Sequence, residues 1–210
     1  MVFHDVIQGS DDWYELRRGI PTASNFSRII TAKTMKLSAQ ADDYICELVG
    51  DKYSHFMPER VENYTTRPMQ FGQMAEEEAR RFYSLERNVD VTNGGFATTD
   101  DGRFGCSVDA FVGDDGCLEI KAPLAKTQVR YLLDGGLPAD YRAQVAGHLI
   151  VSGRAYCDFL AYAVGLPPLL VRVVPDEFTA KLRDALEQFW AKYQQAISDL
   201  ERTYQMGARQ

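Results

Sequence analysis

Apolar residues in the first 85 residues of the chain recur at helical spacing. Four helices are expected there: one around Trp13, one around Phe26, one over 38–49 and one over 73–85. Asp11 and Asp12 are expected to cap the first helix, and Gly50 is expected to close the third. The stretch 53–68 shows no period, so we expect a loop between the third helix and the fourth.

The middle of the chain changes to short runs rich in aromatic and β-branched residues, a composition typical of strands. Strands are expected over 89–92, 96–99, 104–112, 117–121, 156–164 and 169–174. Two helices, over 126–133 and 139–151, precede the last two strands, and a long helix over about 176–204 follows them. This order predicts one domain over 1–210 of the α/β or α+β class, with a central mixed sheet of about five strands flanked by helices.

Composition narrows the class of protein. The chain has 210 residues, of which 45% are hydrophobic and 25% are charged, as in ordinary globular domains. Its longest apolar stretches are too short to span a membrane, and its N-terminus lacks the pattern of a signal peptide. The four cysteines form no C-x-x-C pair, which disfavours a zinc ribbon or a disulfide scaffold and suits reduced thiols in the cytoplasm.

The net charge of −7 argues against a protein that coats nucleic acid without specificity, because such binding needs clustered cations. An enzyme with a locally basic cleft is still allowed, since a cleft focuses the field of the charges that line it. Between 120 and 142 the sequence holds four Lys or Arg residues and two Asp residues. The distribution of charge is therefore more informative than its sum.

The most informative polar residues are Asp109, Glu119 and Lys121. Glu119 and Lys121 lie two apart on a predicted strand, so their side chains leave the same face, and Asp109 lies on the preceding strand of a hairpin. A charged pair on an otherwise apolar strand is costly unless something binds it. Two carboxylates and an amine can hold a divalent cation and act on a water molecule. The alternative is an exposed ion pair across an edge strand.

The register of the hairpin decides whether these side chains meet. With a symmetric two-residue turn at 114–115, Asp109 would lie opposite Ile120 and point away from Glu119. A shared face requires an odd loop or a β-bulge, which the glycines flanking this turn would allow. The hypothesis of a common site therefore predicts an irregular hairpin.

Asp109, Glu119 and Lys121 resemble the D…E-x-K core of the PD-(D/E)XK nuclease superfamily, which implies a restriction-endonuclease-like core. Three further segments resemble motifs of the lambda-exonuclease-like, YqaJ-type phage recombination nucleases: DWYELRRGIPTAS at 12–24, GQMAEEEAR at 72–80 and YRAQV at 141–145. The motifs follow the family's order with similar spacing over most of the chain. On this resemblance, the sequence is identified as a member of that family.

The resemblance implies a 5′→3′ exonuclease that digests one strand of linear double-stranded DNA with 5′-phosphorylated ends, leaving 3′ tails for strand annealing. Two alternatives stay open: a non-catalytic DNA-end-binding module, and an endonuclease on the same fold. The family further implies two Mg²⁺ ions per active site, with Mn²⁺ as a substitute. It also implies a ring-shaped homotrimer, a partner annealing protein, and a phage or prophage origin with action in the bacterial cytoplasm.

The resemblance also implies a role for each residue of the site. The metal ligands would be Glu76, Asp109, Glu119 and the carbonyl of Ile120. Lys121 would position or deprotonate the attacking water, and Gln144 would orient that water or the scissile strand. Carboxylate oxygens suit Mg²⁺ or Mn²⁺, and the absence of clustered His and Cys disfavours zinc.

A second group of residues is implied to bind the DNA end. Arg17, Ser24 and Ser107 would hold the 5′-phosphate, because Arg offers a planar fork of donors and the serines add hydroxyls. Met69 stands where the family carries an apolar wedge that helps to separate the terminal base pairs. The alternative for Met69 is a buried side chain before a helix.

Some positions are less well defined by the motifs. His148, one turn after Gln144, has no counterpart in the motif and is expected to be packed or solvent-facing. The loop 32–36 is hard to align with the family, so both Lys33 and Lys36 are candidates for contact with the substrate. The aromatic residues of the long last helix are expected to pack in the core or against another subunit.

Overall fold

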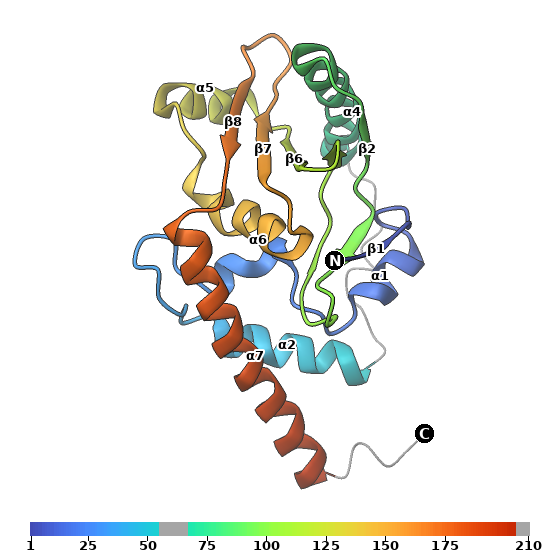
Figure 1. Ribbon diagram of the computed structural model, residues 1–210, viewed down its shortest axis with the longest axis vertical. Coiled ribbons are helices and arrows are strands. Elements are labelled where there is room, and N and C mark those ends of the chain that lie inside the picture. Colours follow the sequence, from blue (N-terminus) through green and yellow to red (C-terminus); the bar gives the residue numbers. More distant parts are fainter. Residues whose placement is uncertain (55–66, 205–210) are drawn as a thin grey trace.

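A mixed sheet of five strands lies at the centre of the molecule (Figure 1). The computed structural model describes residues 1–54 and 67–204, with the backbone alone over 67–74. The strands stand in the order β2 (Val91–Asn93), β5 (Ala110–Val112), β6 (Gly116–Lys121), β7 (Tyr156–Ala161) and β8 (Leu169–Val173). β6 and β7 are parallel, and the other neighbours are antiparallel. The mixed sheet expected from the sequence is confirmed.

A second, three-stranded antiparallel sheet was not predicted. It consists of β1 (Val2–His4), β3 (Phe96–Thr98) and β4 (Gly105–Cys106), with β3 in the middle. The single strand predicted over 104–112 is wrong, because the chain leaves β4 after Cys106, crosses over 107–109 and enters β5 of the central sheet. β1 has only three residues, too few to show an alternating pattern.

Helices occupy the stretches where helical spacing predicts them. They are α1 (Asp11–Arg17), α2 (Ala41–Ser54), α4 (Arg67–Arg87), α5 (Ala125–Asp134), α6 (Arg142–Ser152) and α7 (Glu177–Tyr204), with short 3₁₀ helices η1 (Ala23–Arg28) and η2 (Ala139–Tyr141). Gly50 does not close the third helix, which continues for one more turn, and the fourth begins six residues earlier than predicted. Of the loop predicted over 53–68, residues 55–66 lie outside the described residues. No helix in the described ranges is long and apolar enough to cross a membrane.

Polar side chains fix the first turns of α1 and α7. Ser10, rather than the aspartates that follow it, caps α1, since its Oγ accepts a hydrogen bond from the backbone N–H of Trp13 at 3.3 Å. At the start of α7, Asp176 Oδ1 accepts a hydrogen bond from the backbone N–H of Thr179 at 3.0 Å. Asp176 thus satisfies a backbone N–H in the first turn of α7. This long helix runs away from the sheet, with α2 beside it (Figure 1).

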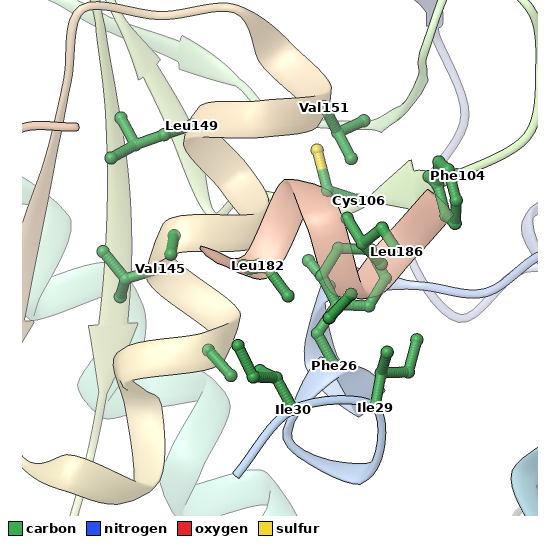
Figure 2. Close-up of a cluster of buried hydrophobic side chains, with 14 of the residues drawn as sticks. Phe26, Ile29, Ile30, Phe104, Cys106, Val145, Leu149, Val151, Leu182 and Leu186 are labelled. Atoms are coloured by element: carbon green, nitrogen blue, oxygen red, sulfur yellow. The ribbon is translucent and has the colours of Figure 1, made fainter. Parts of the chain in front are cut away.

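The two faces of the central sheet pack against different helices. Along β6, Leu118 and Ile120 join Tyr83 of α4 in one buried cluster. The other face packs against η1, α6 and α7, and Figure 2 shows side chains from these elements meeting there, among them Phe26 and Leu182. Because side chains alternate along a strand, the odd-numbered positions of β6 point to the side of α6.

Gly147 allows α6 and η1 to touch. A Cβ atom at this position would lie 2.6 Å from Cδ2 of Phe26 and 2.9 Å from Cβ of Ala23, well inside the usual contact distance between carbon atoms. Gln144 lies on α6 and Ser24 lies on η1. This close contact therefore sets the spacing between two of the predicted site residues.

A buried carboxylate, that of Asp158, joins the sheet to α4. Asp158 of β7 accepts two hydrogen bonds at 2.8 Å from Arg172 of β8 and one at 2.7 Å from the hydroxyl of Tyr83. Tyr83→Phe keeps the ring but removes a donor to a buried charge, so we expect urea unfolding to show a loss of about 2 kcal/mol in the free energy of unfolding. The matched control is Tyr162→Phe, which removes an exposed bond to Glu78. An equal loss in both variants would contradict the importance of the buried bond.

Candidate active site

The loop between β5 and β6 has an odd number of residues. Ala110 pairs with Leu118, and residues 113–115 form the loop. Its first residue is a glycine with a φ of +54°, in the left-handed region that favours glycine. Because the loop is odd, Asp109 and Glu119 lie on the same face of the sheet. The irregular hairpin that a common site requires is confirmed.

Asp109 lies just before β5 and is held by the backbone of β6. Its own N–H donates to the carbonyl of Leu118 at 3.1 Å, and its Oδ2 accepts a hydrogen bond from the N–H of Ile120 at 2.5 Å. These two bonds fix the carboxylate beside the strand that carries Glu119. A metal-ligating role for the Ile120 carbonyl stays a prediction.

A pocket of about 250 Å³ gathers most of the predicted site residues. Its wall is formed by Gln8, Trp13, Arg17, Ser24, Ser107, Asp109, Glu119, Lys121 and Gln144. Gln8 and Trp13 are the two that the sequence did not assign. Glu76 and Ile120 do not form part of this wall, and neither Lys33 nor Lys36 does. Met69 lies in α4, where its side chain is outside the described residues.

Glu119 is almost fully buried, with 1% of its surface exposed. Its Oε1 accepts a hydrogen bond from Nε2 of Gln144 at 2.7 Å and lies 2.5 Å from Nζ of Lys121. Its Oε2 lies 2.8 Å from Nε2 of His148. His148 is packed, one of the two outcomes expected, but its contact with Glu119 was not predicted. The available signal was its spacing of four from Gln144, which puts both residues on one side of α6.

The charges in the pocket shift one another's ionisation. Burial raises the pKa of Asp109 well above its usual range, and repulsion from Glu119 and Glu76 adds to this effect. Burial acts in the same direction on Glu119, but attraction to His148 and Lys121 outweighs it and lowers the pKa of Glu119. Burial would lower the pKa of Lys121, but attraction to Glu119 and Asp109 raises it. Two mutually repelling carboxyl groups thus lie next to one ammonium.

The donor set at this pair fits a divalent cation. Asp109 and Glu119 offer the oxygen ligands that Mg²⁺ prefers, and a cation would relieve the repulsion that raises the pKa of Asp109. Within the described part of the chain, no three His, Cys, Asp or Glu side chains are arranged to hold one metal ion. Glu76 is near enough to act on Asp109, but its carboxylate accepts a hydrogen bond from Arg80 at 3.1 Å. Glu76 would have to release Arg80 to join the pair.

Another part of the wall comes from α1 and η1. Nε1 of Trp13 donates to Oγ of Ser107 at 2.8 Å, and the guanidinium of Arg17 lies 3.9 Å from the centre of the Trp13 ring. Nη2 of Arg17 lies 3.4 Å from Oγ1 of Thr22, which lies 3.2 Å from Oγ of Ser24. The structure thus brings Arg17, Ser24 and Ser107 into one connected group, although their role stays a prediction. Trp13 links them, and its place within the first motif was the available signal.

A larger hollow, of about 480 Å³, lies beside the segment 99–104 and α7. Within it Arg103 donates to the carboxylates of Asp101 and Glu187, so these charges satisfy one another. None of the predicted site residues lines this hollow. The smaller pocket is therefore the candidate active site.

Known proteins resemble the chain in sequence and in structure. The model of the YqaJ-like viral recombinase domain matches residues 12–155, whereas no curated protein matches the chain. An alkaline exonuclease from Laribacter hongkongensis is 27% identical, with a TM-score of 0.80 over 95% of this chain and 100% of that one. The crystal structure of that exonuclease in complex with dAMP gives the same values. A phage-related exonuclease from Haemophilus somnus 129PT is 14% identical, with a TM-score of 0.62 over 89% of this chain and 99% of that one, and shows the fold alone.

Proposed function

The chain belongs to the YqaJ-like viral recombinase family, and from this premise we propose that it is a metal-dependent 5′→3′ exonuclease acting on linear double-stranded DNA. It digests one strand and leaves a 3′ single-stranded tail for recombination by annealing. The observation that carries the proposal is one pocket in which Asp109, Glu119 and Lys121 meet Arg17 and two serine hydroxyls. Similarity to an alkaline exonuclease over that protein's whole length supports it.

In this proposal Asp109 and Glu119 hold the divalent cations, two per active site, with Mg²⁺ as the natural ion and Mn²⁺ as a substitute. When bound there, the cations would supply stabilisation of the charge on the attacking and leaving oxygens of the phosphodiester. Glu76 completes the second metal site after it releases Arg80, and the carbonyl of Ile120 is a further ligand. The chain's own contribution is to hold two carboxylates at one face of β6.

Lys121 and Gln144 act on the reacting groups. Lys121 positions or deprotonates the attacking water, and its ammonium stabilises the charge that develops on the phosphate. Gln144 orients that water or the scissile strand. Because Nζ of Lys121 and Nε2 of Gln144 both lie against Oε1 of Glu119, the two side chains are adjacent to the proposed metal ligands.

Digestion of linear duplex labelled at either the 5′ or the 3′ end tests the proposal, with Mg²⁺ present and with EDTA. We expect the 5′ label to be released first, and only when Mg²⁺ is present. Early release of the 3′ label would overturn the polarity. Stable binding to ends without release of either label would favour the non-catalytic end-binding module. Cleavage of covalently closed circles would favour an endonuclease on this fold.

The family resemblance extends the proposal to partners. It suggests a ring-shaped homotrimer that encloses the duplex, an annealing protein that receives the 3′ tail, and a phage or prophage gene that acts in the bacterial cytoplasm. Light scattering on the purified protein measures the first of these. A mass of three chains is expected, and a monomer that still digests DNA would remove the ring from the proposal.

Arg17 is proposed to detect the 5′-phosphate. Its planar guanidinium is stacked on Trp13 and presents donors to the pocket that also contains Ser24 and Ser107. We expect Arg17→Ala to remove the preference for 5′-phosphorylated over 5′-hydroxyl ends, a change of roughly tenfold or more, as for the loss of one charge-assisted contact of about 1.5–3 kcal/mol. Digestion rates on the two substrates give the preference directly.

The neighbouring residue supplies the control for Arg17. Arg18 carries the same charge directly after the last residue of α1, but it is bonded to Glu15 and to the carbonyl of Asp51 and does not line the pocket. Arg18→Ala should therefore keep the preference for phosphorylated ends. If Arg17→Ala kept it as well, another group would be the sensor of the 5′-phosphate.

A further inference from the structure

His148 is a buried titratable residue that the proposed mechanism does not use. It lies on α6 with 1% of its surface exposed, and its Nε2 lies 2.8 Å from Oε2 of Glu119. Its other ring nitrogen, Nδ1, is buried and has no hydrogen-bond partner among the described residues. A buried polar atom without a partner destabilises a fold, and an apolar side chain at 148 would avoid that cost. The contact with Glu119 is the compensating feature.

The geometry indicates which nitrogen carries the hydrogen. An imidazole nitrogen can donate a hydrogen bond to a carboxylate oxygen only if it carries a proton. The N–H is placed on Nε2, where it can donate to Glu119, because an N–H on Nδ1 would be a buried donor without an acceptor. His148 thus acts as a donor to the carboxylate.

The three donors around Glu119 divide its two oxygens unequally. Lys121 and Gln144 both lie at Oε1, whereas His148 lies at Oε2. A carboxylate oxygen has two acceptor positions, so the described contacts fill both positions of Oε1 and one of Oε2. The bond from His148 therefore fixes the rotation of the carboxylate.

We propose that His148 is a positioning residue that orients Glu119 for binding of the divalent cation. The inference rests on the proposed function, because it concerns the same acid pair. His148 itself does not line the pocket and is too deeply buried to meet substrate or water there, so it acts through Glu119. Bonds of this kind, made to a ligand rather than to the metal, typically change metal affinity or activity by about 10–100-fold when they are removed.

Two substitutions separate the hydrogen bond from the packing. His148→Leu fills the space without a donor, and His148→Gln offers an amide N–H in the position of Nε2. Val151→Ala is the control, because it removes buried side-chain volume from the same helix (Figure 2) at a residue that does not line the pocket. Binding of Mn²⁺ is measured by calorimetry on the full chain without DNA, and melting temperatures are recorded for every variant.

We expect His148→Leu to weaken Mn²⁺ binding by about 10–100-fold and His148→Gln to restore it to within a few-fold of wild type. The loss of digestion rate in His148→Leu should be partly reversed by excess cation, because the missing function is orientation of a ligand. Val151→Ala should bind Mn²⁺ like the wild type even where its melting temperature falls. This pattern would distinguish a positioning role from general destabilisation.

Several outcomes would overturn the proposal. Unchanged Mn²⁺ affinity in His148→Leu, or equal losses in the Leu and Gln variants, would reduce His148 to a packing residue. If the Leu variant does not fold, nitrogen NMR of the wild-type protein shows whether Nε2 of His148 carries a proton. A Nε2 without a proton could not donate to Glu119, and this result would overturn the proposal. A wild-type chain that binds no Mn²⁺ would instead overturn the proposed function, and the role of His148 would fall with it.

Discussion

Lys121→Ala should reduce hydrolysis of linear duplex by about 10³-fold, roughly 4 kcal/mol of transition-state stabilisation, while binding to DNA ends changes little. The ammonium lies at the floor of the pocket, 2.5 Å from Glu119, with only 29% of its side chain exposed. Under the proposed function, it acts on the attacking water and on the developing charge, and it contributes little to binding of the duplex. Single-turnover digestion and end-binding titrations on the same duplex measure the two effects separately.

The control for Lys121 lies a few residues along the chain. Lys126 is exposed on α5 and does not line the pocket, so Lys126→Ala removes the same charge without touching the site. It should leave the rate of hydrolysis within about twofold of wild type, as expected for a surface substitution of less than about 0.5 kcal/mol. Comparable losses of binding and cleavage in Lys121→Ala would contradict a role in the chemical step.

Asp109→Asn should abolish tight cation binding and lower hydrolysis by about 10³-fold, because it removes a shared carboxylate ligand. The same change should make the metal-free protein more stable at neutral pH. Burial and the charges of Glu119 and Glu76 raise the pKa of Asp109, so its ionised form opposes folding. An amide at this position still offers an oxygen to the N–H of Ile120 and adds no charge.

The sign of the pH dependence follows from the raised pKa of Asp109. Below the pKa of the unfolded chain, the carboxyl group is protonated in both states, so wild type and Asp109→Asn should be nearly equal in stability. As the pH rises through the raised value, the wild type loses stability relative to the variant. Saturating Mg²⁺ should reverse this order, because a cation at 100 times its dissociation constant stabilises only the protein that binds it, by about 2.7 kcal/mol.

Thermal unfolding of both proteins, in EDTA and in Mg²⁺ from pH 4 to pH 8, tests this reversal. A variant that melts below the wild type in EDTA at neutral pH would contradict the assigned repulsion. A wild type whose stability does not respond to Mg²⁺ would contradict the assignment of Asp109 as a ligand.

The arrangement of Asp109, Glu119 and Lys121 on one face could be predicted from sequence because its pattern is local. Glu119 and Lys121 share a face of β6 because side chains alternate along a strand. Whether the loop at 113–115 has an odd or an even number of residues determines whether Asp109 points to that same face. The requirement for an odd loop was therefore available from the numbering alone. The length of the long last helix was equally accessible, since its apolar positions repeat over many turns.

Other features depend on contacts between distant segments and left little trace in the sequence. The run 104–112 has the composition of one strand, but its two ends join different sheets, which only tertiary pairing decides. Trp13 and Ser107 are 94 residues apart, and their hydrogen bond has no local signature. The contact of His148 with Glu119 is of the same kind, because a buried histidine and a surface histidine look alike in a single sequence.

The close contact at Gly147 also bears on the size of what the enzyme releases. Under the proposed function, Ser24 of η1 helps to hold the terminal phosphate, and the bond that breaks lies beside the carboxylates that α6 supports. The distance between these two places determines how many nucleotides leave in each cycle. Because Gly147 has no Cβ atom, η1 and α6 pack in direct contact. The distance between the phosphate site and the carboxylates can therefore vary little. Under the proposed function we therefore expect products of a single uniform length, and a bulkier residue at 147 should change that length or make it uneven.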